Sequence, residues 1–122
     1  MNDEIWFHGT PLALEVLAEG STVTRWRALA EAFSHKPAVL CIEDDGSILH
    51  NGSLSGHLYR IAEAVEIGRD LYRHPRTTMD EGLEFLTTRP LRLEYLCDVP
   101  APDKAALAEA QQRIEQLLAQ HR

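Results

Sequence analysis

The sequence predicts a single α+β domain, because short strand-like runs fill its middle and helical patterns lie toward its two ends. Its 122 residues suit one compact domain. Hydrophobic residues make up 44% and charged residues 25%, a balance typical of a soluble globular protein. We expect about six short strands, separated by turns rich in Gly, Pro and Asp. Residues 1–100 would form the domain, and residues 101–122 a C-terminal helix.

The N-terminal third alternates short strands with helical segments. Residues 4–7, which contain the apolar run Ile5-Trp6-Phe7, predict a strand. Residues 11–18 predict one or two helical turns that end at Gly20. A brief β-prone run at residues 21–24 precedes a helix over residues 26–35, which Pro37 closes.

The middle of the chain carries the clearest β signal. Residues 38–42 form an apolar run, the sequence Asp-Asp-Gly then favours a turn, and residues 47–50 resume the strand, so we predict a hairpin. Another strand is expected at residues 57–62. The charged stretch that follows predicts a loop with a short helix near Asp70. Two more strands are expected, at residues 83–87 and 91–96.

The last segment, residues 101–122, predicts a strong helix with Asp103 near its start. One face carries an apolar seam at spacings of three and four, formed by Leu107, Ala110, Ile114, Leu117 and His121. A single helix of this length is marginal alone in water, so something must cover the seam. We expect the helix to pack on its own domain, with a homodimer contact from its distal half.

Composition excludes several classes of function. The formal net charge of −7 disfavours non-specific nucleic-acid binding, which depends on basic surface. No apolar run reaches the length of a membrane span, and the acidic start of the chain does not have the pattern of a signal peptide. The two cysteines make neither a disulfide framework nor a zinc site, so we expect a cytoplasmic protein without a metal. Six central arginines are expected mostly to pair with neighbouring carboxylates: Arg60, Arg69, Arg73, Arg76, Arg89 and Arg92.

The tripeptide His8-Gly9-Thr10, which follows the first apolar run, is the most informative motif. Glycine permits close backbone approach, so a ligand could lie against the main chain while His8 and Thr10 reach it from either side. The alternative is a strand end whose Thr10 caps the helix that Pro11 begins. The two interpretations are compatible, since helix N-termini also bind anions.

The order of these features resembles the ADP-ribosyltransferase fold. It is most similar to the small bacterial branch with the rifamycin ADP-ribosyltransferases, and more distantly to RNA 2′-phosphotransferases. His8-Gly9-Thr10 resembles the first NAD-binding motif, and Thr22-Val23-Thr24 the second strand. The run from Gly56 through Tyr59 to Ile61 resembles the central strand, and residues 84–93 the late strand pair. The resemblance implies two small, mainly antiparallel sheets around a cleft that holds NAD.

The resemblance also implies roles for particular residues. His8 would bond the ribose or the nicotinamide end, and the Gly9 backbone would meet the carboxamide. Thr10, Thr22 and Tyr59 would complete the NAD site. The glycosidic bond to nicotinamide breaks through an oxocarbenium-like centre, which a nearby carboxylate stabilises. The rifamycin-type pattern points to Asp70 as that carboxylate, whereas the commoner family pattern points to Glu84.

One departure from the family keeps two functions open. The second motif usually offers a tyrosine or histidine that stacks on nicotinamide, but residues 21–24 contain neither, and Trp26 is the nearest aromatic residue. The sequence therefore predicts either an NAD-dependent transferase with an unknown acceptor, or a degenerate domain of the same fold that binds a nucleotide or a protein.

Overall fold

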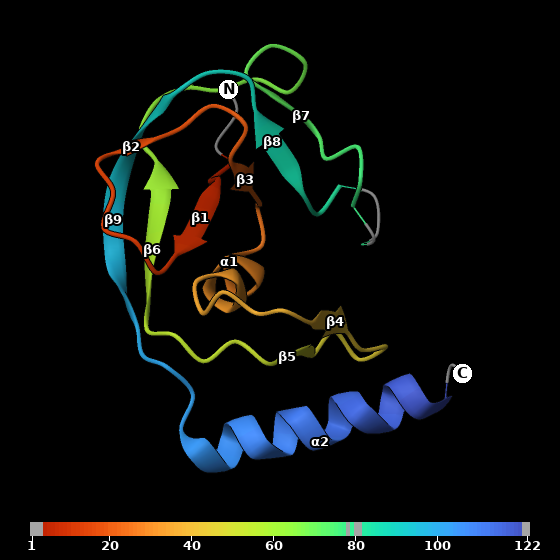
Figure 1. Cartoon of the computed structure of the whole chain (residues 1–122). Helices are drawn as coiled ribbons and strands as arrows, with labels where there is room; N and C mark the ends of the chain where they lie inside the picture. The colour runs from red at the N-terminus through yellow and green to blue at the C-terminus, as the bar shows by residue number, and fades with distance from the viewer. Residues whose placement is uncertain (1–3, 78, 80–81, 121–122) are drawn as a thin grey trace.

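The α+β class is confirmed: the computed structural model, which describes residues 4–77, 79 and 82–120, holds two helices and mainly antiparallel sheets (Figure 1). The largest sheet has four strands in the order β1 (Phe7–Thr10), β6 (Gly56–Ile61), β9 (Leu91–Val99) and β2 (Val16–Leu17). A three-stranded sheet has the order β3 (Thr22–Val23), β8 (Phe85–Thr87) and β7 (Leu71–Arg73). A separate hairpin contains β4 (Leu40–Ile42) and β5 (Ile48–His50).

The two larger sheets meet where β1 passes β3. Phe7 donates its amide to the Thr24 carbonyl at 2.7 Å, and Thr24 donates to the Phe7 carbonyl at 3.0 Å. The main core lies between these sheets and is closed by an edge-to-face contact of Trp6 with Phe85, whose ring centroids are 4.9 Å apart. Its other buried members are aliphatic: Leu17, Val23, Ile61, Leu71 and Leu91.

Helix α1 (Arg27–Phe33) packs on β1 and explains three glycines. A Cβ built on Gly9 would lie 1.7 Å from the Ala30 carbonyl oxygen. The same construction at Gly56 would meet the Ser34 hydroxyl at 2.2 Å, and at Gly52 it would meet the Cβ of His35 at 2.7 Å. Glycine is therefore needed at these positions because the end of α1 approaches the backbone closely.

The first two expected elements differ from the structure. The first strand is β1, so the chain continues as a strand through Gly9 and Thr10 instead of stopping at the glycine. The predicted helix over residues 11–18 is wrong, because this segment ends in the short strand β2, which pairs with β9. The Tyr59 hydroxyl accepts the Leu14 amide at 2.9 Å and donates to the Leu12 carbonyl at 3.3 Å. Hydrogen bonds to Tyr59 thus satisfy the Leu14 amide and the Leu12 carbonyl, which a helix would have paired within itself.

The stretch after β6 also differs in detail. The short helix expected near Asp70 is absent from the described residues; a turn over 68–70 leads directly into β7, which the sequence did not indicate. β7 pairs with β8 in the register Leu71 to Thr87. β9 extends to Val99, beyond the residue 96 expected from the sequence, because β6 pairs with residues 93–99 of this strand.

Helix α2 (Lys104–Gln120) matches the expected C-terminal helix within the described residues. Asp103 caps it, accepting the Ala106 amide at 2.7 Å. Ile114 is buried, and Leu107, Ala110 and Leu117 are half-buried on the same face. α2 packs against β5, which covers part of the seam; His121 lies outside the described residues. No helix in the described part of the chain is long and apolar enough to cross a membrane.

Candidate functional site

The candidate site is a cavity of about 380 Å³ formed where β1, β3, α1 and the start of β8 meet. It is lined by His8, Gly9, Gly20, Ser21, Thr22, Phe33 and Glu84. A larger cavity, about 790 Å³, lies between α2 and the β4–β5 hairpin, with apolar walls and an acidic rim. The smaller cavity is the candidate site because its lining residues include a histidine, a glutamate and two hydroxyl residues, the side-chain types that reactive chemistry needs.

His8 is held as a neutral imidazole with a defined tautomer. Its Nδ1 lies 2.7 Å from the Thr22 carbonyl oxygen, which can only accept, so Nδ1 carries the proton. Burial lowers the pKa of His8, and the bond to Thr22 opposes this only in part. Nε2 therefore presents a lone pair. This atom has no hydrogen-bond partner among the described residues, so it can accept a hydrogen bond from a ligand hydroxyl.

Glu84 stands immediately before β8 and lines the same cavity. The Thr77 hydroxyl donates to Glu84 Oε1 at 2.5 Å, and the Met79 amide in turn donates to the Thr77 hydroxyl at 3.1 Å. The Glu84 carbonyl accepts the His74 amide at 3.1 Å. These bonds fix both the backbone and one carboxylate oxygen, so the negative charge has a defined position.

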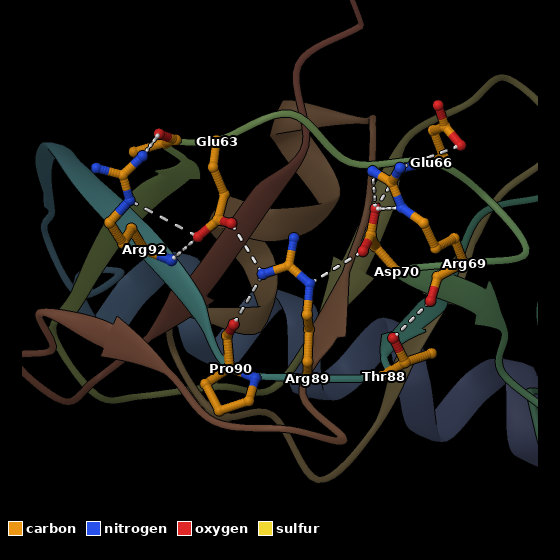
Figure 2. Close-up of polar contacts among 9 residues, drawn as sticks. Glu63, Glu66, Arg69, Asp70, Thr88, Arg89, Pro90 and Arg92 are labelled. Carbon is orange, nitrogen blue, oxygen red and sulfur yellow. Dashed lines mark hydrogen bonds and ion pairs between the residues drawn. The ribbon is translucent and has the colours of Figure 1, made fainter.

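Asp70, the other candidate carboxylate, lies outside this cavity in an ion-pair network (Figure 2). It is 2% exposed and accepts from Arg69 at 2.9 Å, from Arg89 at 3.0 Å and from the Glu66 amide at 2.9 Å. Hydrogen bonding to Arg69, above all, lowers the pKa of Asp70 to about 2. A carboxylate whose oxygens are occupied in this way is suited to holding the structure together.

The same network extends to Glu63. Arg89 also donates to Glu63 at 2.8 Å, and Glu63 accepts the Arg92 amide at 2.7 Å (Figure 2). The network joins the loop before β7 to the turn between β8 and β9. Most of the central arginines described are paired as expected: Arg60 with Glu94, Arg69 with Glu66 and Asp70, Arg89 with Glu63 and Asp70, and Arg92 with Glu63.

The remaining residues assigned from the sequence fall into two groups. Gly9 and Thr22 line the cavity, although the close approach that Gly9 permits is made by α1. Thr10 does not cap a helix; it is buried, and its hydroxyl accepts the Leu12 amide at 3.1 Å. Tyr59 is also buried, and its hydroxyl fixes residues 12–14 away from the cavity.

Two contributors were not singled out from the sequence. Phe33 lines the cavity with an aromatic ring, although its helical spacing indicated only a core position. Thr77 donates a hydrogen bond to Glu84 from a loop whose sequence has no recognisable motif. Trp26, the nearest aromatic residue in sequence to the second motif, lines a different cavity with His35 and His50.

The arrangement is suited to binding a polar organic ligand. Among the described residues no group of three or more His, Cys, Asp or Glu side chains could hold a metal ion. No family model, no curated protein and no solved structure matches this chain.

Proposed function

We propose that the chain is an ADP-ribosyltransferase-like enzyme that binds NAD in the cavity between β1, β3 and α1. The observation that carries the proposal is that His8 and Glu84, about 76 residues apart in the sequence, line one cavity. The volume of about 380 Å³ falls in the range of small-molecule sites, about 300–1,000 Å³. The order of motifs that resembles this fold supports the same assignment.

In this proposal each side chain has a defined part in the reaction. His8 Nε2 accepts a hydrogen bond from a ribose hydroxyl and so orients the sugar. The bond from C1′ of the ribose to the nicotinamide nitrogen breaks, and its electron pair leaves with nicotinamide. Glu84 stabilises the positive charge that develops on the ribose, and an acceptor nucleophile then forms the new bond to C1′ and releases its proton. Phe33 offers a ring face for the pyridine or the base.

The test combines binding with turnover. Calorimetry and thermal shift with NAD, ADP-ribose and a 2′-phosphorylated RNA identify the ligand, and nicotinamide release measures bond breaking. Glu84→Gln keeps an acceptor for Thr77 but removes the charge, so it should bind NAD nearly as the wild type does and release nicotinamide about 100-fold more slowly. His8→Ala should weaken binding by about tenfold, the effect of one lost hydrogen bond. Glu109→Gln, an exposed change on α2, is the control and should alter neither.

A second candidate function, binding without reaction, is favoured by the missing aromatic residue of the second motif. The stretch 21–24 lacks the aromatic residue of the second motif, and Trp26 lies at another cavity. The alternative is therefore a domain of the same fold that binds a nucleotide or a protein without reaction. Binding of ADP-ribose or NAD without nicotinamide release, unchanged by Glu84→Gln, would favour it. Absence of binding to either nucleotide at millimolar concentration would contradict the transferase.

A further inference from the structure

Within the described residues, the β4–β5 hairpin contacts both helices but joins neither of the larger sheets. It forms its own two-stranded sheet, and β5 lies between α1 and α2 (Figure 1). An isolated two-stranded hairpin is marginally stable in water. Its position therefore depends on the side chains that fix it to the two helices, and His50, the last residue of β5, is one of them.

His50 serves as a hydrogen-bond acceptor. The Gly52 amide donates to His50 Nδ1 at 3.1 Å, so Nδ1 must carry a lone pair. An imidazolium has a proton on both nitrogens and cannot accept any bond. Protonation of His50 is therefore incompatible with the turn that follows β5, unless the ring rotates or the turn opens.

His35, just beyond the end of α1, adds a second titratable ring. It is 5% exposed, and its Nδ1 donates to the Leu54 carbonyl at 2.7 Å. Its ring is stacked on that of His50, with centroids 5.4 Å apart and an angle of 14° between the planes. Gly52 lies directly against the Cβ and the backbone carbonyl of His35, so a Cβ on Gly52 would have no space. One histidine pair thus fastens the segment 50–54 to the end of α1.

Few charged side chains on the neighbouring elements can stabilise an additional proton on the His35–His50 pair. From α1, Glu31 lines the same cavity, but Arg27 lies 3.9 Å from its carboxylate. From α2, Lys104 lines a cavity with Asn51 and Ser53, and Arg113 pairs with Glu43 at 3.2 Å.

In the hairpin turn, Asp45 accepts the Ser47 amide at 2.9 Å. The adjacent Asp44 is exposed, and Lys36 next to His35 adds a positive charge. Burial, followed by the charge of His35, lowers the pKa of His50.

We propose that the His35–His50 pair is an acid-operated latch, which releases the β4–β5 hairpin from α1 in mild acid. The undocked hairpin exposes His50 to water and takes up a proton more readily than the docked one. Because proton uptake and undocking are linked, the undocked form is favoured as the pH falls below the ordinary pKa range of histidine. The docked form is favoured above that range. Undocking would also open the cavities that the hairpin shares with α2 and with Met79.

The full chain can be tested by NMR and amide hydrogen exchange between about pH 7.5 and pH 5. The opening equilibrium of the amides in β4 and β5 and of Gly52 should rise by up to about tenfold per pH unit for each proton bound. The amides of β6 and β9 should keep their protection. The ¹⁵N shifts of His50 should show an unprotonated Nδ1 at neutral pH, and its titration midpoint should coincide with hairpin release.

Two matched variants separate the latch from general acid effects. His50→Asn places a carbonyl oxygen where Nδ1 stands, so it can accept the Gly52 amide as an Asx turn but cannot be protonated, and the acid transition should disappear. His74→Asn is the control, because His74 Nδ1 accepts the Arg76 amide at 3.1 Å in the same way outside the hairpin. That variant should release its hairpin as the wild type does.

Any of four results would overturn the proposal. Hairpin protection that is unchanged down to pH 5 would remove the latch, as would an equal transition in wild type and His50→Asn. Simultaneous loss of protection in β6 and β9 would show global unfolding instead. If His50→Asn does not fold, the wild-type comparison of the His50 titration with hairpin exchange decides, because different midpoints contradict the latch.

Discussion

Replacing Asp70 with Asn should destabilise the fold, because three donors converge on its buried carboxylate. The lowering of the pKa of Asp70 to about 2 corresponds to about 2 kcal/mol. The arginine side chains are 59% and 42% exposed, so water screens part of this, and about 1 to 2 kcal/mol remains. The amide nitrogen of Asn would face a donor, which adds about 1 kcal/mol. We therefore expect a loss of about 2 to 3 kcal/mol.

Urea unfolding followed by far-UV circular dichroism measures this loss. With an m-value of about 1 to 1.5 kcal/mol/M, the midpoint should fall by about 2 M at neutral pH. Because the folded pKa of Asp70 is lowered, its stabilisation is present above about pH 4 and is lost as the pH falls toward 2. The difference between Asp70→Asn and wild type should shrink over that range.

Asp44→Asn is the matched control, since Asp44 is exposed in the hairpin turn. Its midpoint should stay close to that of wild type. An Asp70→Asn midpoint equal to that of the control would refute the reasoning, because it would mean that the network in Figure 2 contributes no stability.

Four further outcomes follow from contacts described above. Gly9→Ala should cost at least about 2 kcal/mol, since its Cβ would meet the Ala30 carbonyl at 1.7 Å; an unchanged Tm would contradict this. Thr87→Val removes a buried hydroxyl with two backbone partners and should cost about 1 to 3 kcal/mol in urea unfolding. Ile114→Ala should cost about 2 to 4 kcal/mol by thermal unfolding, because its side chain is buried. The homodimer through α2 stays a prediction, which light scattering on the full chain tests. The lowered pKa of His8 means that its contribution to stability is lost as the pH falls below the ordinary histidine range, which Tm values from about pH 8 to pH 5 will show.

Helices and strands that are determined by a pattern within their own short stretch of sequence could be predicted. The hairpin follows from its Asp-Asp-Gly turn, and both helices follow from apolar spacings of three and four. β2 and β7 have only two and three residues, and each exists because a strand distant in sequence pairs with it. No pattern within such a short segment distinguishes it from a loop, so tertiary context decides.

The candidate site was predictable to a similar extent. Polar residues in recognisable motifs, such as His8, Thr22 and Glu84, were assigned from the sequence and share the cavity. Phe33 was not, because an aromatic residue on the inner side of a helix has the same spacing whether it faces core or cavity. The role of Gly9 differed for a related reason: a sequence indicates that a backbone must be approached closely, but not whether a ligand or a helix approaches it.

The order of strands in the largest sheet has a consequence for synthesis of the chain. β1, β6 and β9 are neighbours in space but come from the beginning, middle and later part of the sequence. The ribosome delivers the N-terminal part first, yet β6 has only one partner until residues 91–99 have emerged. During that interval β6 has an open edge that another nascent chain can pair with. Slower elongation beyond residue 62 should therefore lengthen the period in which this edge is exposed.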